Sequence, residues 1–134
     1  MTAQPEQFRT AKQAWIWLPA VAWAAFIATL TSIPGSKMPR QPFIHFDLIV
    51  HAAVYAALGF LAHRAFFRGT SFTWLGRAWV LPLFLGLVYA ALDEIHQTWI
   101  PGRSCALEDF IADGLGAALG VWVYFSRFAR PGRR

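Results

Sequence analysis

The chain has 134 residues, of which 57% are hydrophobic and only 14% are charged. A soluble domain carries about 25% charged residues, so this composition excludes an ordinary soluble domain and predicts an integral membrane protein. The net charge of +5 would by itself be compatible with nucleic-acid binding. The arginines flank apolar segments, however, so we expect no nucleic-acid partner. The single cysteine, Cys105, excludes an intrachain disulfide and a metal site built from cysteines alone.

Four apolar segments predict four transmembrane helices, each close to the roughly 20 residues that cross a bilayer. They cover residues 15–33, 47–67, 78–99 and 106–125. Pro34-Gly35 ends the first segment, and Pro101-Gly102 turns the chain between the last two. The predicted fold is therefore an all-α membrane bundle. Its parts are a polar N-terminal segment at 1–14, the membrane domain at 15–125 and a basic tail at 126–134.

The distribution of lysine and arginine predicts how this bundle is oriented. The two termini and the middle loop share one side, with Arg9, Lys12, Arg64, Arg68, Arg77, Arg127, Arg130, Arg133 and Arg134. The opposite side carries only Lys37, Arg40 and Arg103. Basic residues favour the cytoplasmic side, so we expect both termini in the cytoplasm. The predicted location is the bacterial cytoplasmic membrane, with a multi-pass topology.

Nearly all the acidic residues fall at the predicted outer ends of the helices. Carboxylates beside membrane-length apolar segments are energetically costly, so they usually have a function or a partner. With neighbouring polar side chains they predict a pocket at the extracytoplasmic end that binds a ligand. The candidate ligand-binding residues are Asp47, His51, Tyr55, Asp93, Glu94, His96, Gln97, Arg103, Asp109 and Asp113.

Spacing on the second helix leaves two interpretations of its polar residues. Four-residue steps place Asp47, His51 and Tyr55 on one helical face. A divalent metal is one alternative, with Asp47, His51, Asp93 and His96 as candidate ligands. We favour the other, in which Asp47 caps the helix and His51 bonds a neighbouring carboxylate. No cofactor is assigned at this stage.

The fourth helix carries a stripe on which acids and glycines lie together. Asp109, Asp113, Gly116 and Gly120 share one face at helical spacing. The two glycines have the small-x-x-x-small spacing that permits close helix packing in lipid. We therefore expect this face to lie against other helices. Asp113, which is deeper than the first turn, is the strongest candidate for a buried functional group.

Arg103 is a cation close in sequence to several of these acids. It either pairs internally with Asp109 or Glu94, which we favour, or clamps a phosphate or carboxylate with its planar guanidinium.

Taken together, these motifs resemble those of the VanZ-like family over residues 15–125. The residues that carry the resemblance are Asp47, His51 and Tyr55, the block Asp93-Glu94-x-His96-Gln97, the run Pro101-Gly102-Arg103, and Asp109-x-x-x-Asp113 with Gly116 and Gly120. Family members usually carry asparagine at the position of Asp113. The resemblance implies a small multi-helix membrane protein. Through the family's founding member, it also implies a link to resistance against the glycopeptide antibiotic teicoplanin.

Three functions stay open. The first is a cell-envelope protein that lowers susceptibility to lipid-bearing glycopeptides by binding the drug or altering an envelope lipid. The second is a membrane enzyme acting on a lipid-linked or phosphorylated substrate, with Asp93, Glu94, His51 and Asp113 as candidate catalytic or metal-binding residues. The third is a structural or partner-binding bundle. The expected partners are membrane lipids, a lipid-linked envelope intermediate or a lipoglycopeptide.

Overall fold

The computed structural model describes the backbone of residues 5–40, 42–69 and 79–129, and the side chains of these ranges from residue 13 onward. It contains four α-helices, α1 (Pro5–Thr31), α2 (Phe46–Gly69), α4 (Val80–Gln97) and α5 (Leu107–Tyr124). A 3-10 turn, η1 (Gly35–Lys37), follows α1, and a π-helical turn, η2 (Phe125–Ala129), extends α5. No strand occurs within the described ranges, so the predicted all-α class is confirmed.

The observed helices start and end close to the predicted positions, with one exception. α1 begins at Pro5, ten residues before the predicted start of the first helix at residue 15. The reason is that residues 6–14 are rich in Gln, Ala, Glu and Lys, which favour helix, and that proline is tolerated in a first turn. The predicted polar segment is therefore largely a helical extension. The loop ending at Arg77 and the last residues of the basic tail lie outside the described residues.

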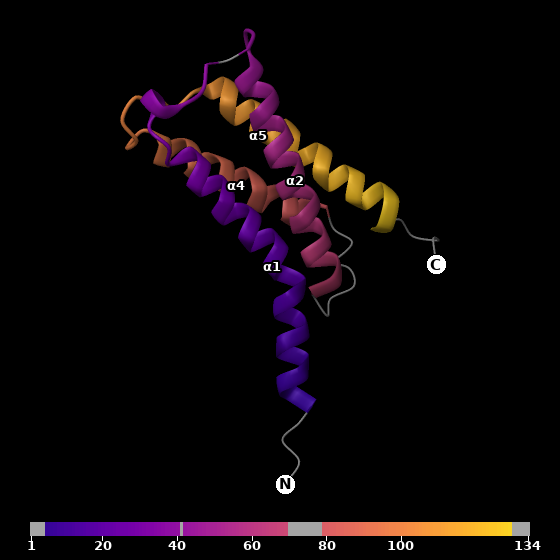
Figure 1. The fold of residues 1–134 in the computed structure, drawn as a ribbon. Helices are drawn as coiled ribbons and strands as arrows, with labels where there is room; N and C mark the ends of the chain where they lie inside the picture. The colour runs from indigo at the N-terminus through magenta and orange to yellow at the C-terminus, as the bar shows by residue number, and fades with distance from the viewer. Residues whose placement is uncertain (1–4, 41, 70–78, 130–134) are drawn as a thin grey trace.

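α2 makes the most extensive contacts with the other helices, packing against α1, α4 and α5 (Figure 1). Its most extensive contact is with α5, and glycines make this contact close. A Cβ atom at Gly116 would overlap the backbone carbonyl of Ala52, and one at Gly120 would overlap that of Ala56. The two backbones therefore touch directly, which confirms the packing predicted from the glycine spacing.

Two connections lie at the same end of the bundle, which we call the pocket end. They are residues 32–45, between α1 and α2, and residues 98–106, between α4 and α5 (Figure 1). The Gly35 N–H donates a hydrogen bond of 3.0 Å to the Pro101 carbonyl. A Cβ at Gly35 would overlap the backbone of Gly102, which itself has a positive φ of 75°. These contacts fix the two connections against each other.

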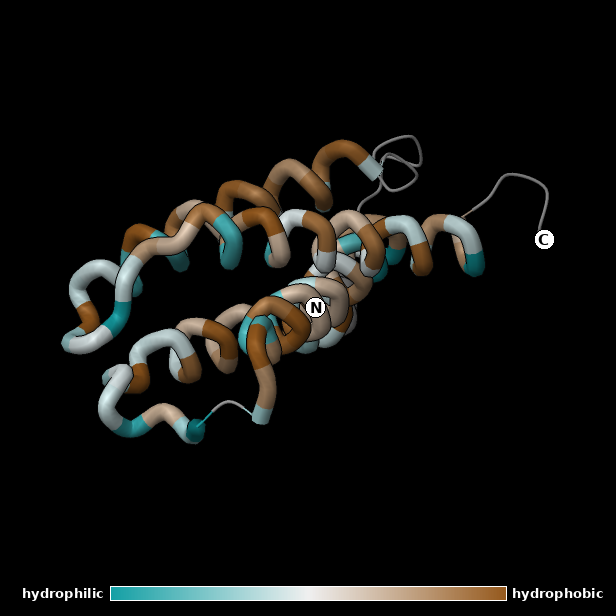
Figure 2. The backbone as a smooth tube through the Cα atoms, turned by 90° about the horizontal axis from the view of Figure 1, so that it is seen from above, coloured by the Kyte–Doolittle hydropathy of each residue, from teal (hydrophilic) through white to brown (hydrophobic). Residues whose placement is uncertain are grey.

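Many large apolar residues of the helices are exposed. Hydrophobic residues occupy much of the helices, and hydrophilic residues gather near their ends and in the connections (Figure 2). Val21, Phe84 and Leu115 are 61%, 57% and 67% exposed. Soluble monomers rarely expose contiguous apolar surface of this kind. Two helical segments, Gln13–Thr31 and Phe46–Gly69, are long and apolar enough to cross a membrane. α4 and α5 have 18 residues each and carry the buried acids, and they are not among these two segments.

Candidate functional site

Three carboxylates are buried at the pocket end of the bundle. Asp93 is 5% exposed, Glu94 is 2% exposed and Asp113 is fully buried. The first two lie in the last turns of α4, and the third lies in the second turn of α5. Because burying a carboxylate is costly without compensation, each of these groups needs hydrogen bonds, a counter-charge or a proton.

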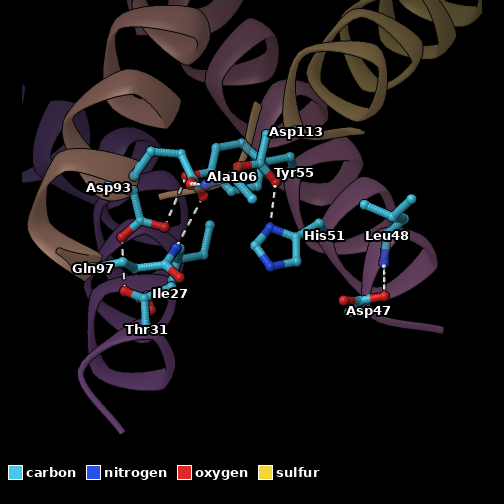
Figure 3. A network of polar contacts seen from close by, with 11 residues as sticks. Ile27, Thr31, Asp47, Leu48, His51, Tyr55, Asp93, Gln97, Ala106 and Asp113 are labelled. Carbon is cyan, nitrogen blue, oxygen red and sulfur yellow. Dashed lines mark hydrogen bonds and ion pairs between the residues drawn. The ribbon is translucent and has the colours of Figure 1, made fainter. Parts of the chain in front are cut away.

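Asp93 connects three helices. Its carboxylate accepts a hydrogen bond of 2.7 Å from the Thr31 hydroxyl, at the end of α1, and one of 3.2 Å from the Tyr55 hydroxyl on α2 (Figure 3). The Thr31 hydroxyl also lies 3.1 Å from the backbone carbonyl of Ile27. Tyr55 is 1% exposed, so this network belongs to the core of the bundle.

Glu94 connects the end of α4 to the start of α5. Its carboxylate accepts a hydrogen bond of 2.9 Å from the backbone N–H of Ala106, the residue that precedes α5. A second bond, of 3.1 Å, comes from the side-chain amide of Gln97, which is itself 2% exposed. The N-cap residue of α5, Ala106, has no side chain that can cap the helix. Glu94 instead fixes the start of α5 by accepting the hydrogen bond from the Ala106 N–H.

His51 and Asp113 lie at the distance of an ion pair. Nδ1 of His51 lies 2.9 Å from Oδ1 of Asp113, with the imidazole side chain 14% exposed (Figure 3). Oδ2 of Asp113 is buried and has no hydrogen-bond partner. His51 therefore bonds a carboxylate of a neighbouring helix, as one of the two interpretations of its spacing predicts.

Two of the predicted metal ligands lie away from this group. Asp47 accepts a hydrogen bond of 3.0 Å from the Leu48 N–H and stands apart from the buried network (Figure 3). The His96 ring packs edge-on against Trp99, with ring centroids 6.3 Å apart. α2 begins at Phe46, so Asp47 lies in its first turn and bonds the next N–H. Of the four predicted metal ligands, Asp47 and His96 therefore lie apart from the buried acids, whereas His51 and Asp93 belong to the buried network.

A cavity of about 620 Å³ lies beside the buried acids. It is enclosed by the end of α1, the start of α2 and the two connections of the pocket end. Its apolar lining includes Leu30, Met38, Val50 and Val54. Its polar lining includes Thr31, Arg40, Asp47, His51, Tyr55, Gln97, Arg103 and Asp109. The cavity therefore combines an apolar wall with both cationic and anionic groups.

Arg103 lines this cavity without the internal partner that the sequence favoured. Among the described residues it forms no ion pair with Asp109 or Glu94. The Glu94 carboxylate is instead engaged by Ala106 and Gln97. The guanidinium Nε is buried and has no hydrogen-bond partner.

Sequence reasoning assigned no role in the site to two of these contributors. Thr31 lies beside Asp93 because α1 packs against α4, a contact that the sequence does not reveal. Arg40 was assigned to the outer loops by charge alone, and the structure places it at the cavity.

The family model described as VanZ/LLP1 matches residues 3–129 of this chain. The chain belongs to the VanZ/LLP1 family. The match extends over nearly the whole sequence, so the resemblance carried by the acidic and glycine motifs is confirmed. No match was found among curated proteins or among solved structures. VanZ/LLP1 membership and the two apolar spans together mark the chain as a membrane protein.

Proposed function

We propose that this VanZ/LLP1 protein binds a phosphate-bearing headgroup in the cavity of its pocket end. The ligand would be an envelope lipid or a lipid-linked envelope intermediate. In this proposal all four helices cross the cytoplasmic membrane, both termini are cytoplasmic, and the cavity opens at the outer surface. By holding such a lipid, the protein would lower susceptibility to lipid-bearing glycopeptides.

The observation that carries the proposal is the state of Arg103. Leaving a buried donor without a partner costs about 1–3 kcal/mol, and more when the group is charged. The Nε of Arg103 is such a donor, and its guanidinium lines the cavity. A guanidinium presents parallel N–H groups that fit two oxygens of a phosphate. A phosphate in the cavity would therefore satisfy a group that the protein itself leaves unsatisfied.

The lining of the cavity supports an amphiphilic ligand over a free phosphate ion. Leu30, Met38, Val50 and Val54 contribute an apolar wall, which suits the first part of an acyl or prenyl chain. Arg40 adds a second cation near the same space. Ligand sites typically combine such apolar walls with a few placed polar groups.

Lipid retention tests this proposal. Native mass spectrometry of the purified protein should show bound phospholipid for the wild type. Arg103→Lys should lower the bound fraction about tenfold, because lysine keeps the charge and loses the paired N–H groups, a change on the order of 1.4 kcal/mol. Arg68→Lys is the matched control, since Arg68 is exposed in the last turn of α2, at the other end of the bundle. Equal lipid retention by wild type and Arg103→Lys would refute the assignment of the phosphate to this residue.

Cys105 offers a test of orientation. The thiol is exposed in the connection between α4 and α5, so we expect a membrane-impermeant maleimide to label it in intact cells. Desolvation and the nearby Glu94 carboxylate raise the pKa of the Cys105 thiol, so the reaction is best run at mildly alkaline pH. The control is Arg68→Cys in a Cys105→Ser background. Labelling of that variant in intact cells, with Cys105 protected, would reverse the proposed orientation.

A second function, a membrane enzyme, is favoured by one specific observation. His51 lines the cavity and lies 2.9 Å from buried Asp113, an arrangement that can orient an imidazole for proton transfer. Purified protein incubated with a lipid-linked pyrophosphate distinguishes the two functions. Turnover by the wild type that is lost in His51→Gln supports the enzyme, whereas recovery of intact lipid supports binding alone.

A further inference from the structure

We propose that His51, Glu94 and Asp113 form a binding site for a divalent transition-metal ion at the base of the cavity. One nitrogen or oxygen from each of these residues lies within 4.8 Å of the others. The three side chains come from α2, α4 and α5, so the helix packing itself assembles the group. The site shares only His51 with the ligand set predicted from helical spacing, but its three residues are all among the candidate catalytic or metal-binding residues of the predicted enzyme.

The charges at this point of the molecule favour a cation. Asp93, Glu94 and Asp113 are buried together, and among the described residues the one ion pair they form is between His51 and Asp113. His51 therefore lies close to two of these carboxylates, Glu94 and Asp113. Buried charges are paired with opposite charges or coordinate metals, because desolvation without compensation is costly.

The unpaired oxygen of Asp113 is a second, independent observation that points to a bound cation. This carboxylate is fully buried, and its Oδ2 has no hydrogen-bond partner, whereas Asp93 and Glu94 each accept two hydrogen bonds. Figure 3 shows the Asp113 side chain directed toward His51. A metal ion between these groups would occupy the free oxygen and replace the proton that the imidazole and carboxylate share.

One imidazole and two carboxylates form a donor set that suits Zn²⁺ or Mn²⁺. With metal–ligand bonds of about 2.1 Å, two ligand atoms of one ion lie at most about 4.2 Å apart. The three ligand atoms lie within 4.8 Å of one another, so side-chain movements of less than about 1 Å would let all three bind one ion. The cavity beside His51 leaves space for water or a ligand oxygen to complete the coordination. The inference does not depend on headgroup binding, because the three ligands belong to the protein alone.

Metal binding to the full-length purified protein tests the inference. After treatment with a chelator, wild-type protein in detergent should bind one equivalent of Zn²⁺ or Mn²⁺ by isothermal titration calorimetry, confirmed by elemental analysis. Asp113→Asn should bind at least tenfold more weakly, because the amide can still accept a hydrogen bond from His51 but is a poor metal ligand. His96→Ala and Asp47→Asn are the matched controls at the same end of the bundle and should bind as the wild type does.

Thermal unfolding separates loss of the site from loss of the fold. Added Zn²⁺ should raise the Tm of the wild type and of His96→Ala, and leave the Tm of Asp113→Asn unchanged. Wild-type protein that binds no metal, or Asp113→Asn that binds it equally well, would overturn the inference. Equal weakening in His96→Ala or Asp47→Asn would also overturn it, since the ion would then lie elsewhere.

Discussion

Replacing Gly120 with alanine is expected to destabilise the protein by more than about 2 kcal/mol, since overpacking a close contact commonly costs about 1–3 kcal/mol. The added Cβ would overlap the Ala56 carbonyl and approach the Phe60 backbone nitrogen to 2.7 Å. Both are backbone atoms of α2, and they cannot relieve the overlap by a change of rotamer as a side chain can. The helices would have to separate along their most extensive contact, and the buried acids between them would lose their geometry.

Gly86→Ala is the control for this prediction. Its Cβ would meet only the Ala117 Cβ, at 3.4 Å, so the change should stay within about 1 kcal/mol of the wild type. Thermal or denaturant unfolding of both variants in the same detergent measures the difference. If Gly120→Ala unfolds at the wild-type midpoint, α2 and α5 do not pack as closely as described.

Arg103→Lys and Glu94→Gln are each expected to remove most of the proposed effect on glycopeptide susceptibility. Lysine loses the planar pair of N–H groups, and glutamine loses the charge of the residue that anchors Ala106. The readout is the inhibitory concentration of teicoplanin for cells that express each variant at matched membrane levels. We expect a milder loss for Asp113→Asn, which keeps a hydrogen bond to His51 and introduces the usual family residue.

Changes at Arg133 and Arg134, which lie outside the described residues, should have little effect and serve as controls. Full activity of both Arg103→Lys and Glu94→Gln would show that the pocket end is not the working part of the molecule.

The helices and the gathering of acids at one end could be predicted because both depend on local pattern. The length of an apolar segment shows where a helix can cross a bilayer. Because successive helices run in opposite directions, α2 and α5 start at the end of the bundle where α1 and α4 finish. The contact through Gly116 and Gly120 was predictable for the same reason, since a stripe of small residues marks where backbones approach. α1 was predicted too short because hydropathy detects the membrane span, and not the polar turns before it.

Partners within the site could not be predicted, because they depend on how far each helix is rotated and shifted against its neighbours. Spacing indicated that His51 bonds a carboxylate but could not say which one, and the structure pairs it with Asp113, 62 positions away. It also suggested an internal partner for Arg103, but Glu94 is already engaged by Ala106 and Gln97. Which of several nearby groups becomes the partner of His51 or Arg103 is decided by the packing between helices.

The most direct measurement is a crystal structure of the protein grown from a lipid mesophase that contains phosphatidylglycerol. If the cavity holds a phosphate-bearing headgroup, a phosphate oxygen should lie about 3 Å from a guanidinium nitrogen of Arg103, with the chain of the lipid along Val50 and Val54. A structure in which Arg103 forms an ion pair with Asp109, across a cavity without lipid, would contradict the proposed function.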